Sequence, residues 1–544
     1  MTHEPAAVPR HAGWGARTAA GMALFVLALT LLASLRYSPQ VYWQGRDDGI
    51  YAYDGMVLYA GGVLYRDAWE NKPPGALYTI ALGYALFGVN RWAIWGIELI
   101  VVAASALVMA GLMAAVFRRG SVILAGTAAY ILLARHPDFA ADANFTETYA
   151  LLPQALVFAL GYAFLRQPSN TRAAAVGLSA AAVFLTKYTA IGAALMLIPA
   201  LVVARHPVVR APGRWRWLAA MALAGLVPLA AVAAYFSAHG VLATALDATI
   251  VQPGAYHAWV SAEPVSVADM LVRTLFLSTV PAVFGPLIVF WGVAAIQTLR
   301  GRPAPDAPPA HAASARALAL WALFALVADL LLTNLTGRGY RHYYITPVPA
   351  LAILIAIGVS FVRAARWPRA RPRLLARIAW AYLVVMLIFR PAQDTIRKWS
   401  WAGWDPGAPV REDPVSRYIR AHTAPGDRVL VWGASSDYNF QARRFSPTRF
   451  HYSYPLLIPG YTTEAQLAEF LDDLARNRPA LIVDAGWSDG EWVPPLAADV
   501  REAWRAEKWR RDTPDLGAVY AFVEAHCALE TTIDRVYLYR CAYD

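Results

Sequence analysis

The sequence predicts a polytopic α-helical membrane protein with a soluble α/β domain at its C-terminal end. The 544-residue chain is 58% hydrophobic and only 16% charged, whereas globular proteins carry about 25% charged residues. Apolar segments of membrane-spanning length recur through residues 1–391, while residues 392–544 alternate strand-like with helix-like segments. We therefore expect a membrane domain over 1–391 and a small α/β domain over 392–544.

The apolar segments predict about eleven membrane spans, because a bilayer core of about 30 Å requires roughly 20 apolar residues in a helix. They lie near residues 18–35, 92–117, 120–134, 148–165, 172–186, 188–204, 217–237, 269–298, 317–334, 343–362 and 378–390. The segments 120–134 and 172–186 are short for a span. Since the number of spans is odd, the two ends of the membrane domain are expected on opposite sides.

Basic residues set the orientation of these spans and explain the net charge of +11. If Arg10 and Arg17 lie in the cytoplasm, every second connection carries a basic cluster, as the positive-inside rule requires. The clusters are Arg118/Arg119, Arg166/Arg172, Arg205/Arg210/Arg214/Arg216, Arg300/Arg302/Arg316 and Arg363/Arg366/Arg369/Arg371/Arg373/Arg377. The charge is therefore topological, and we expect no nucleic-acid partner. The acid-rich connections and the C-terminal domain are expected on the outer side of a bacterial inner membrane.

The first exterior loop, residues 36–91, is long and polar, and loops of this kind are usually functional or disordered. Its aromatic and apolar residues argue against disorder. The pattern over 50–62 favours an amphipathic helix on the outer membrane surface, ended by Gly61-Gly62. A second interfacial helix is expected over 72–88, closed by Gly88.

The exterior loops contain the groups that sugar transfer outside the cell requires. That compartment has no ready supply of nucleotide sugars, so a transferase there needs a lipid-carried donor. A carboxylate must take a proton from the acceptor hydroxyl, and cations must stabilise a leaving phosphate. Asp47 and Asp48 offer the base. Lys72, Arg341, His342 and the neighbouring tyrosines could bind the phosphate.

Each of these patterns also has a structural interpretation. The Asp47-Asp48 pair could cap a helix. The motif Lys72-Pro73-Pro74 could be a rigid turn with a snorkelling lysine. The run Arg341–Tyr344 could belong to an interfacial belt of aromatic and basic residues.

Further polar residues of the exterior loops are candidates for orienting a substrate. Asp142 and Glu147 lie in the second exterior loop, and Tyr256 and His257 lie in the third. Lys187 is either a snorkelling span end or a phosphate contact, and the pattern favours the first. His136 and Asp138 form an incomplete ligand set, so no metal site is predicted there.

The C-terminal domain is expected to contain strands at 429–433, 480–486, 519–525 and 535–541, with a helix at 464–477. Cys527 and Cys541 are the two cysteines of the chain, and both fall in this domain. They predict either a disulfide across paired strands in an oxidising compartment or two unpaired thiols. Their spacing alone does not decide between these alternatives.

Taken in order, these motifs resemble those of the polyprenyl-phosphate-sugar-dependent GT-C glycosyltransferases. The resemblance covers about residues 30–390 and is to the branch with the bacterial lipid A aminoarabinose transferases and the protein O-mannosyltransferases of family 39. It rests on Asp47-Asp48, GGVLYRDAWENKPPG, Thr146-Glu147 and Arg341–Tyr344. The sequence departs from the usual pattern at Asp48, where Glu is common, and at Asn71, where an acid often precedes the lysine.

The resemblance implies an inverting transfer in which Asp47 is the catalytic carboxylate and Lys72, His342 and Tyr343 lie at the donor phosphate. We therefore expect an inner-membrane glycosyltransferase that uses a polyprenyl-phosphate sugar and a lipid, glycan or protein acceptor. No cofactor is required by this scheme, and a divalent metal is left open. The alternatives are a transporter or flippase and an inactive sugar-binding scaffold. A transporter is less favoured because the spans hold few charges besides Glu98 and Asp329.

Overall fold

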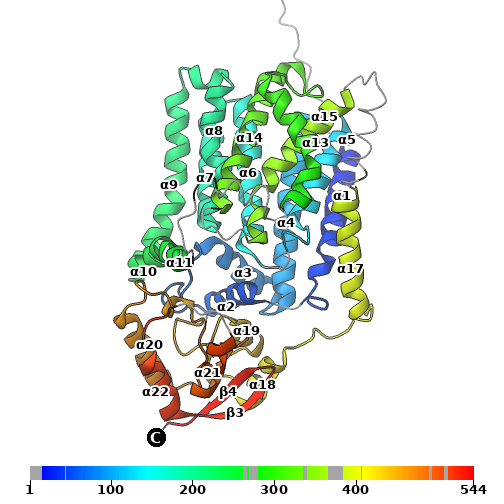
Figure 1. Cartoon of the computed structure of the whole chain (residues 1–544). Helices are drawn as coiled ribbons and strands as arrows, with labels where there is room; N and C mark the ends of the chain where they lie inside the picture. The colour runs from blue at the N-terminus through cyan, green and yellow to red at the C-terminus, as the bar shows by residue number, and fades with distance from the viewer. Residues whose placement is uncertain are drawn as a thin grey trace, which may run out of the picture.

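The computed structural model describes residues 15–42, 45–140, 143–260, 266, 268, 280–334, 340–364, 381, 384–405, 407–488, 493–507 and 512–543. A bundle of long helices forms one part of the molecule, and a small α/β domain forms the other (Figure 1). Two short helices of the first loop, α2 and α3, lie between these two parts (Figure 1).

The bundle contains a helix at each segment that was predicted to span the membrane. Its helices are α1 (Ala16–Ser34), α4 (Arg91–Val116), α5 (Gly120–Ala134), α6 (Thr146–Arg166), α7 (Asn170–Thr186), α8 (Gly192–Val203), α9 (Arg214–Ala238), α13 (Val280–Leu299), α14 (Ala312–Asn334), α15 (Val348–Ala364) and the π-helical turn Val385–Phe389 that continues into α17 (Arg390–Trp401). Five of the described helices are both long and apolar enough to cross a membrane, and several shorter ones are apolar. Residues 269–279 of the predicted segment 269–298, and residues 378–380 and 382–383 of the segment 378–390, lie outside the described residues.

Small residues allow the helices of the bundle to pack closely, as is usual where lipid supplies no hydrophobic drive for association. Gly177 of α7 lies against α9, where a Cβ atom would overlap the carbonyl oxygen of Met221. Gly161 of α6 likewise accommodates the ring of Trp321, which is fully buried in α14. Backbone proximity therefore sets the interface of α7 with α9, whereas the ring of Trp321 fills the space beside Gly161.

The two acids inside the bundle have structural partners. Glu98 lies 3.6 Å from the Arg135 guanidinium and accepts a hydrogen bond from the backbone N–H of Asn144 at 2.8 Å. Asp329 accepts a hydrogen bond from the backbone N–H of Gly192 at 2.9 Å. Polar groups inside a membrane commonly mark transport pathways, but these two have partners that join helices and loops.

The first loop forms the two predicted helices, α2 (Arg46–Tyr59) and α3 (Pro74–Phe87). Proline at the first position of α3 suits a helix start, and Gly88 ends it with a φ of +76°. The expectation of an amphipathic α2 on the membrane surface is wrong. Residues 48–58 are all buried, because the C-terminal domain covers the side of α2 that faces away from the bundle (Figure 1).

Two short helices, α10 (Leu242–Leu246) and α11 (Gln252–Val260), follow α9 at the same end of the bundle as α2 and α3 (Figure 1). The intervening residues Asp247–Val251 form a π-helical turn. Tyr461 of the C-terminal domain donates a hydrogen bond to Asp247 at 2.6 Å. This end of the bundle therefore also contacts the C-terminal domain.

The C-terminal domain contains a four-stranded sheet in the order β1-β2-β4-β3. Its strands are β1 (Val429–Trp432), β2 (Leu481–Asp484), β3 (Cys527–Ile533) and β4 (Val536–Cys541), with β1 parallel to β2 and the other pairs antiparallel. Its helices are α18 (Pro414–His422), α19 (Asp437–Ala442), α20 (Glu464–Asn477), α21 (Ala498–Glu507) and α22 (Gly517–His526). A mainly helical membrane fold with a C-terminal α/β domain is thus confirmed.

One predicted strand is wrong. Residues 519–525 belong to helix α22, and the edge strand of the sheet is instead β3. A short apolar run does not distinguish a strand from a buried helix by periodicity. In the structure, Val519 and Val523 lie one helical turn apart and are both buried, which favours the helix.

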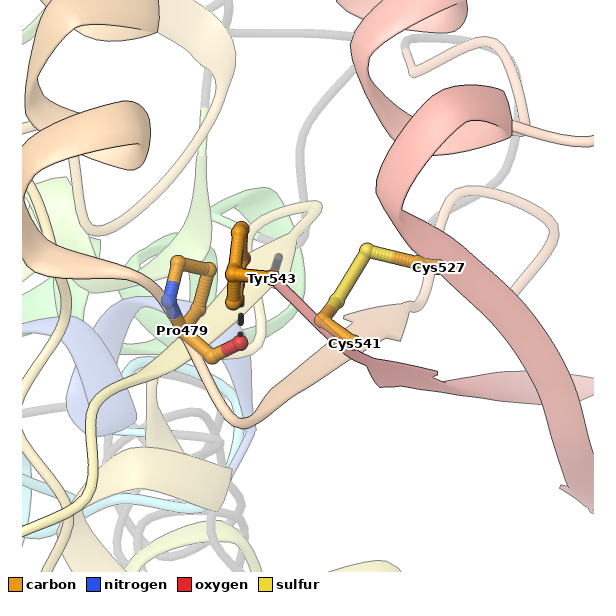
Figure 2. Close-up of a disulfide and its surroundings, with 4 residues drawn as sticks. All are labelled: Pro479, Cys527, Cys541 and Tyr543. Carbon is orange, nitrogen blue, oxygen red and sulfur yellow. Dashed lines mark hydrogen bonds between the residues drawn. A yellow bond between two sulfur atoms is a disulfide. The ribbon is translucent and has the colours of Figure 1, made fainter.

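The two cysteines form a disulfide between the paired strands β3 and β4, where Cys527 and Cys541 are register partners with Cα atoms 4.0 Å apart (Figure 2). Close to the bridge, the Tyr543 hydroxyl donates a hydrogen bond to the Pro479 carbonyl at 3.1 Å (Figure 2). The end of the chain is thereby attached to the segment that leads into β2.

Candidate active site

A polar cavity of about 240 Å³ lies where the first loop, the bundle and the C-terminal domain meet. Its lining combines acids, a lysine, amides and many tyrosines: Arg46, Asp47, Ile50, Tyr51, Glu70, Asn71, Lys72, Gln252, Tyr256, Tyr340, Tyr343, Tyr452 and Tyr454. The residues come from α2, the loop before α3, α11, the turn before α15 and the C-terminal domain. We identify it as the candidate active site because it brings together Asp47, Lys72, Tyr256 and Tyr343 of the predicted residues.

The two adjacent acids of the first loop have different surroundings. Asp47 is exposed and lines the polar cavity. Asp48 is buried, and it accepts a hydrogen bond from the Tyr42 hydroxyl at 2.8 Å in a small separate cavity beside Arg91. Neither acid is the cap residue, which is Gly45, although both lie in the first turn of α2, where the helix dipole favours negative charge. Of these two acids, only Asp47 therefore faces the polar cavity.

Lys72 is held in the cavity by a compact turn. The Glu70 carboxylate accepts hydrogen bonds from the backbone N–H groups of Asn71 at 2.7 Å and of Lys72 at 3.0 Å. The Tyr65 hydroxyl donates to the Lys72 carbonyl at 2.9 Å. The Asn71 side chain donates to Gln252 of α11 at 3.1 Å. Lys72 lines the polar cavity, and its ammonium group donates a hydrogen bond to the Asn71 side chain.

A buried ion pair lies near the cavity, between Lys187 and Glu147. Lys187 Nζ is 2.7 Å from Glu147 Oε1, and the two side chains are only 7% and 1% exposed. The interpretation of Lys187 as a snorkelling span end is therefore wrong. Both residues act electrostatically on His342, and Lys187 also does so with Asp47 and Lys72. Sequence reasoning undervalued Lys187 because the end of α7 looks the same whether its lysine faces lipid or protein.

Of the turn Arg341–Ile345, Tyr343 lines the polar cavity, whereas Arg341 and His342 are not among its lining residues. His342 stacks on Phe145 with ring centroids 4.0 Å apart. The Tyr343 ring lines the polar cavity and lies 5.0 Å from Lys187 Nζ. Arg341 is exposed and is not among the lining residues. The structure therefore separates Arg341 from the predicted phosphate-binding group.

Helix α11 separates the two candidates of the third exterior loop. Tyr256 lines the polar cavity, whereas His257 lines a second, apolar cavity. Asp142, the remaining candidate for orienting a substrate, lies outside the described residues.

The apolar cavity has a volume of about 680 Å³ and adjoins the Lys72 turn. Its lining is mostly aliphatic and aromatic: Tyr65, Pro73, Pro74, Phe184, Leu185, Tyr188, Thr189, Leu229, Val232, Ala233, Phe236, Leu242, Ala245, Leu246, Thr249, Ile250, Pro253, Gly254 and His257. Pro73 and Pro74 belong to this cavity, while the preceding Lys72 belongs to the polar one. An apolar space and a polar, charged space are thus joined at one turn.

A buried cluster of titratable groups lies behind the polar cavity. His451 of the C-terminal domain is 2.9 Å from Asp54 of α2, and Glu70 interacts with both residues. Burial, reinforced by Asp54, raises the pKa of Glu70 to about 8. Burial also raises the pKa of Asp54 well above its usual value and lowers that of His451 to about 4. Burial therefore favours the protonated form of both carboxyl groups.

Within the part of the chain that the structure describes, no group of three or more His, Cys, Asp or Glu side chains is arranged to hold a metal ion. His136 and Asp138 are 3.8 Å apart, and Asp138 instead pairs with Arg390 at 2.8 Å.

Known proteins resemble this chain in two ways: a family profile matches part of the sequence, and solved structures share the fold. A profile of the family described as dolichyl-phosphate-mannose-protein mannosyltransferase matches residues 71–235. No curated protein sequence matches the chain at a significant level.

Two solved structures of ArnT from Cupriavidus metallidurans have a similar fold. The structure bound to undecaprenyl phosphate is 14% identical, with a TM-score of 0.56, and the match covers 95% of this chain and 98% of that chain. The apo structure is 16% identical, with the same TM-score of 0.56, and the match covers 96% and 98%. The predicted fold class and the resemblance to GT-C glycosyltransferases are thereby confirmed.

Proposed function

We propose that this multi-pass membrane protein is an inverting glycosyltransferase that moves a sugar from a polyprenyl-phosphate carrier to an acceptor hydroxyl. The observation that carries the proposal is the junction of the two cavities at the Lys72 turn. A polyprenyl phosphate sugar has an apolar chain, an anionic phosphate and a polar ring in that order. The apolar cavity, Lys72 and the polar cavity follow in the same order. The ArnT structure bound to undecaprenyl phosphate supports this class of donor.

In the proposed reaction, Asp47 takes the proton of the acceptor hydroxyl, and the acceptor oxygen forms a bond to the anomeric carbon. The bond from that carbon to the phosphate oxygen breaks, and the leaving polyprenyl phosphate keeps the electron pair. Attack opposite the phosphate inverts the anomeric configuration. Lys72 stabilises the negative charge that develops on the leaving phosphate. Lys187 and His342 act on it from farther away, and Glu147 keeps Lys187 in place.

We further propose that the reaction takes place on the outer face of the bacterial inner membrane. The basic clusters of the described connections α4–α5, α6–α7, α8–α9 and α13–α14 support this orientation, because these connections lie at the ends of the helices opposite the cavity. The disulfide between Cys527 and Cys541 supports it as well, because such bonds persist in oxidising compartments such as the periplasm. The acceptor is a lipid, glycan or protein that carries a free hydroxyl.

The test is sugar transfer by the purified protein from a panel of polyprenyl-phosphate sugars, with the wild type beside Asp47→Asn. Loss of a general base typically costs about 10²–10⁴-fold in rate, so we expect a decrease of that order without loss of folding. Asp534→Asn, on the exposed β3–β4 turn, is the matched control and should retain wild-type turnover. Equal turnover by wild type and Asp47→Asn would exclude Asp47 as the base. A wild type that is inert with every donor would contradict the proposed function.

A further inference from the structure

A segment of the C-terminal domain, Arg449–Tyr454, is attached directly to the first loop. The backbone N–H of Trp69 donates to the Arg449 carbonyl at 2.8 Å, and the Arg449 guanidinium donates to the Tyr65 carbonyl at 3.2 Å. His451 lies 2.9 Å from Asp54, and both side chains are fully buried. The segment thus lies beside the Lys72 turn, and both line the polar cavity.

The other side of this segment is fixed to the sheet of the C-terminal domain. The backbone N–H of Ser453 donates to the Gly433 carbonyl at 2.7 Å, and the backbone N–H of Gly433 donates to the Ser453 hydroxyl at 2.9 Å. Gly433 directly follows β1, which is parallel to β2. Ligands of α/β sheets commonly bind outside the carboxyl ends of parallel strands. The segment therefore lies at the edge of the sheet where a ligand is expected.

Tyr452 and Tyr454 extend from this segment into the lining of the polar cavity. Their ring centroids are 6.2 Å apart, and the Tyr452 ring is 5.7 Å from that of Trp69. Asp47 and Lys72 belong to the same cavity and come from the first loop. The C-terminal domain therefore supplies one wall of the space in which the donor phosphate and the base are placed.

The size and chemistry of the cavity fit one sugar ring. Its volume of about 240 Å³ is smaller than the roughly 300–1,000 Å³ of sites for drug-sized ligands. Six of its lining residues are tyrosines: Tyr51, Tyr256, Tyr340, Tyr343, Tyr452 and Tyr454. A tyrosine offers an apolar ring face and a hydroxyl that seeks a hydrogen bond. A pyranose likewise presents C–H groups on its face and hydroxyls on its rim.

We propose that Tyr452 and Tyr454 bind the sugar that is transferred, so that the C-terminal domain determines donor-sugar specificity rather than acceptor specificity. This inference rests on the proposed function. The cavity has space for one ring, and Lys72 anchors the phosphate to which the donor sugar is joined. The acceptor needs to bring only its hydroxyl to Asp47, which is exposed.

The experiment compares Tyr454→Ala with wild type by steady-state kinetics on the donor panel. We expect the KM for the preferred donor to rise about tenfold, the order expected for loss of an aromatic contact, and the ranking of sugars to change. The KM for the acceptor should stay within about twofold. Sugar-free undecaprenyl phosphate should inhibit both proteins equally, because the tyrosines contact the sugar and not the carrier.

Two further variants separate specificity from folding. Tyr454→Leu retains apolar volume without the flat ring and should reproduce the altered ranking, whereas Tyr454→Phe tests the hydroxyl alone. Tyr543→Ala, near the disulfide in Figure 2, is the control for loss of a tyrosine from the same domain and should leave the donor ranking unchanged. Melting temperatures identify any variant that fails to fold.

The outcomes distinguish this inference from the proposed function. An active wild type whose donor ranking is unchanged in both Tyr454→Ala and Tyr454→Leu would overturn the inference alone. A rise in the KM for the acceptor with an unchanged KM for the donor would also overturn it. A wild type without turnover on any donor would overturn the proposed function instead.

Discussion

Replacement of Lys187 by methionine tests the energetics of the buried ion pair beside the candidate active site. Lys187 and Glu147 are 2.7 Å apart, and their side chains are 7% and 1% exposed. Removal of one member of such a pair leaves a buried charge without its partner, which costs about 3–5 kcal/mol. The Thr146 hydroxyl donates to the Glu147 carboxylate at 3.0 Å. Because this bond offsets part of the loss, we expect a cost near the lower end of that range.

The double variant Lys187→Met/Glu147→Gln should restore stability, because it removes both charges and retains similar volumes. Replacement of buried ion pairs by neutral side chains is often neutral or stabilising. The measurement is the apparent unfolding temperature in detergent, followed by tryptophan fluorescence, for the wild type, both single variants and the double variant. Equal destabilisation in the Lys187→Met and double variants would refute the reasoning, as would a Lys187→Met variant as stable as wild type.

The same four proteins separate stability from function. If Lys187 contributes to binding of the donor phosphate, the restored double variant will still have a higher KM for the donor. An increase of about tenfold corresponds to 1.4 kcal/mol, which is reasonable for a charge that acts without lining the cavity. A fully stable double variant with wild-type kinetics would make the pair a structural element only.

The other predictions concern packing, protonation and metals. Gly177→Val should lower the unfolding temperature, since a Cβ there meets the Met221 backbone, whereas Gly111→Val should have little effect because nothing lies within 4 Å. The folded pKa of Glu70, about 8, exceeds its ordinary value of 4.5, so stability should fall as the pH rises between those values. The pKa of His451 is lowered to about 4 in the folded state, so its contribution makes stability rise as the pH rises from about 4 to 6.5. Stability measured from pH 6.5 to 8 therefore isolates the carboxyl effect, and Glu70→Gln should reduce its slope. Donor turnover should be unchanged by EDTA; loss of turnover restored by a divalent ion would contradict the metal-free scheme.

The sequence predicted those helices whose ends are determined by neighbouring residues, such as capping residues, prolines and glycines. Helix α20 matches its predicted range of 464–477 because Thr463 and Gln466 form a capping box in front of an amphipathic stretch. Helix α3 likewise begins after Pro73 and ends at Gly88, where the backbone requires a positive φ. These boundaries depend on a few neighbouring residues, so they can be predicted without knowledge of the rest of the fold.

The parts that sequence reasoning missed depend on contacts between distant segments. The acids Asp47 and Asp48 look equivalent in sequence, and only the packing of α2 buries one and exposes the other. Helix α2 was expected at a membrane surface because nothing local shows that the C-terminal domain covers it. Tyr452 and Tyr454 lie more than 350 residues after the first loop, and no local pattern indicates that they reach the same cavity.

Burial of the first loop between two domains bears on how its groups act. Electrostatic interactions strengthen where water is excluded, so the proposed effect of Lys72 on a leaving phosphate depends on the wall that the C-terminal domain supplies. Arg449 joins that wall to the loop that leads to Lys72, and His451 joins it to Asp54 of α2. Removal of the C-terminal domain would therefore open the polar cavity to water and release the Lys72 turn from one of its supports. The membrane bundle and the C-terminal domain are for this reason best regarded as two halves of one site, with Asp47 exposed to the space between them.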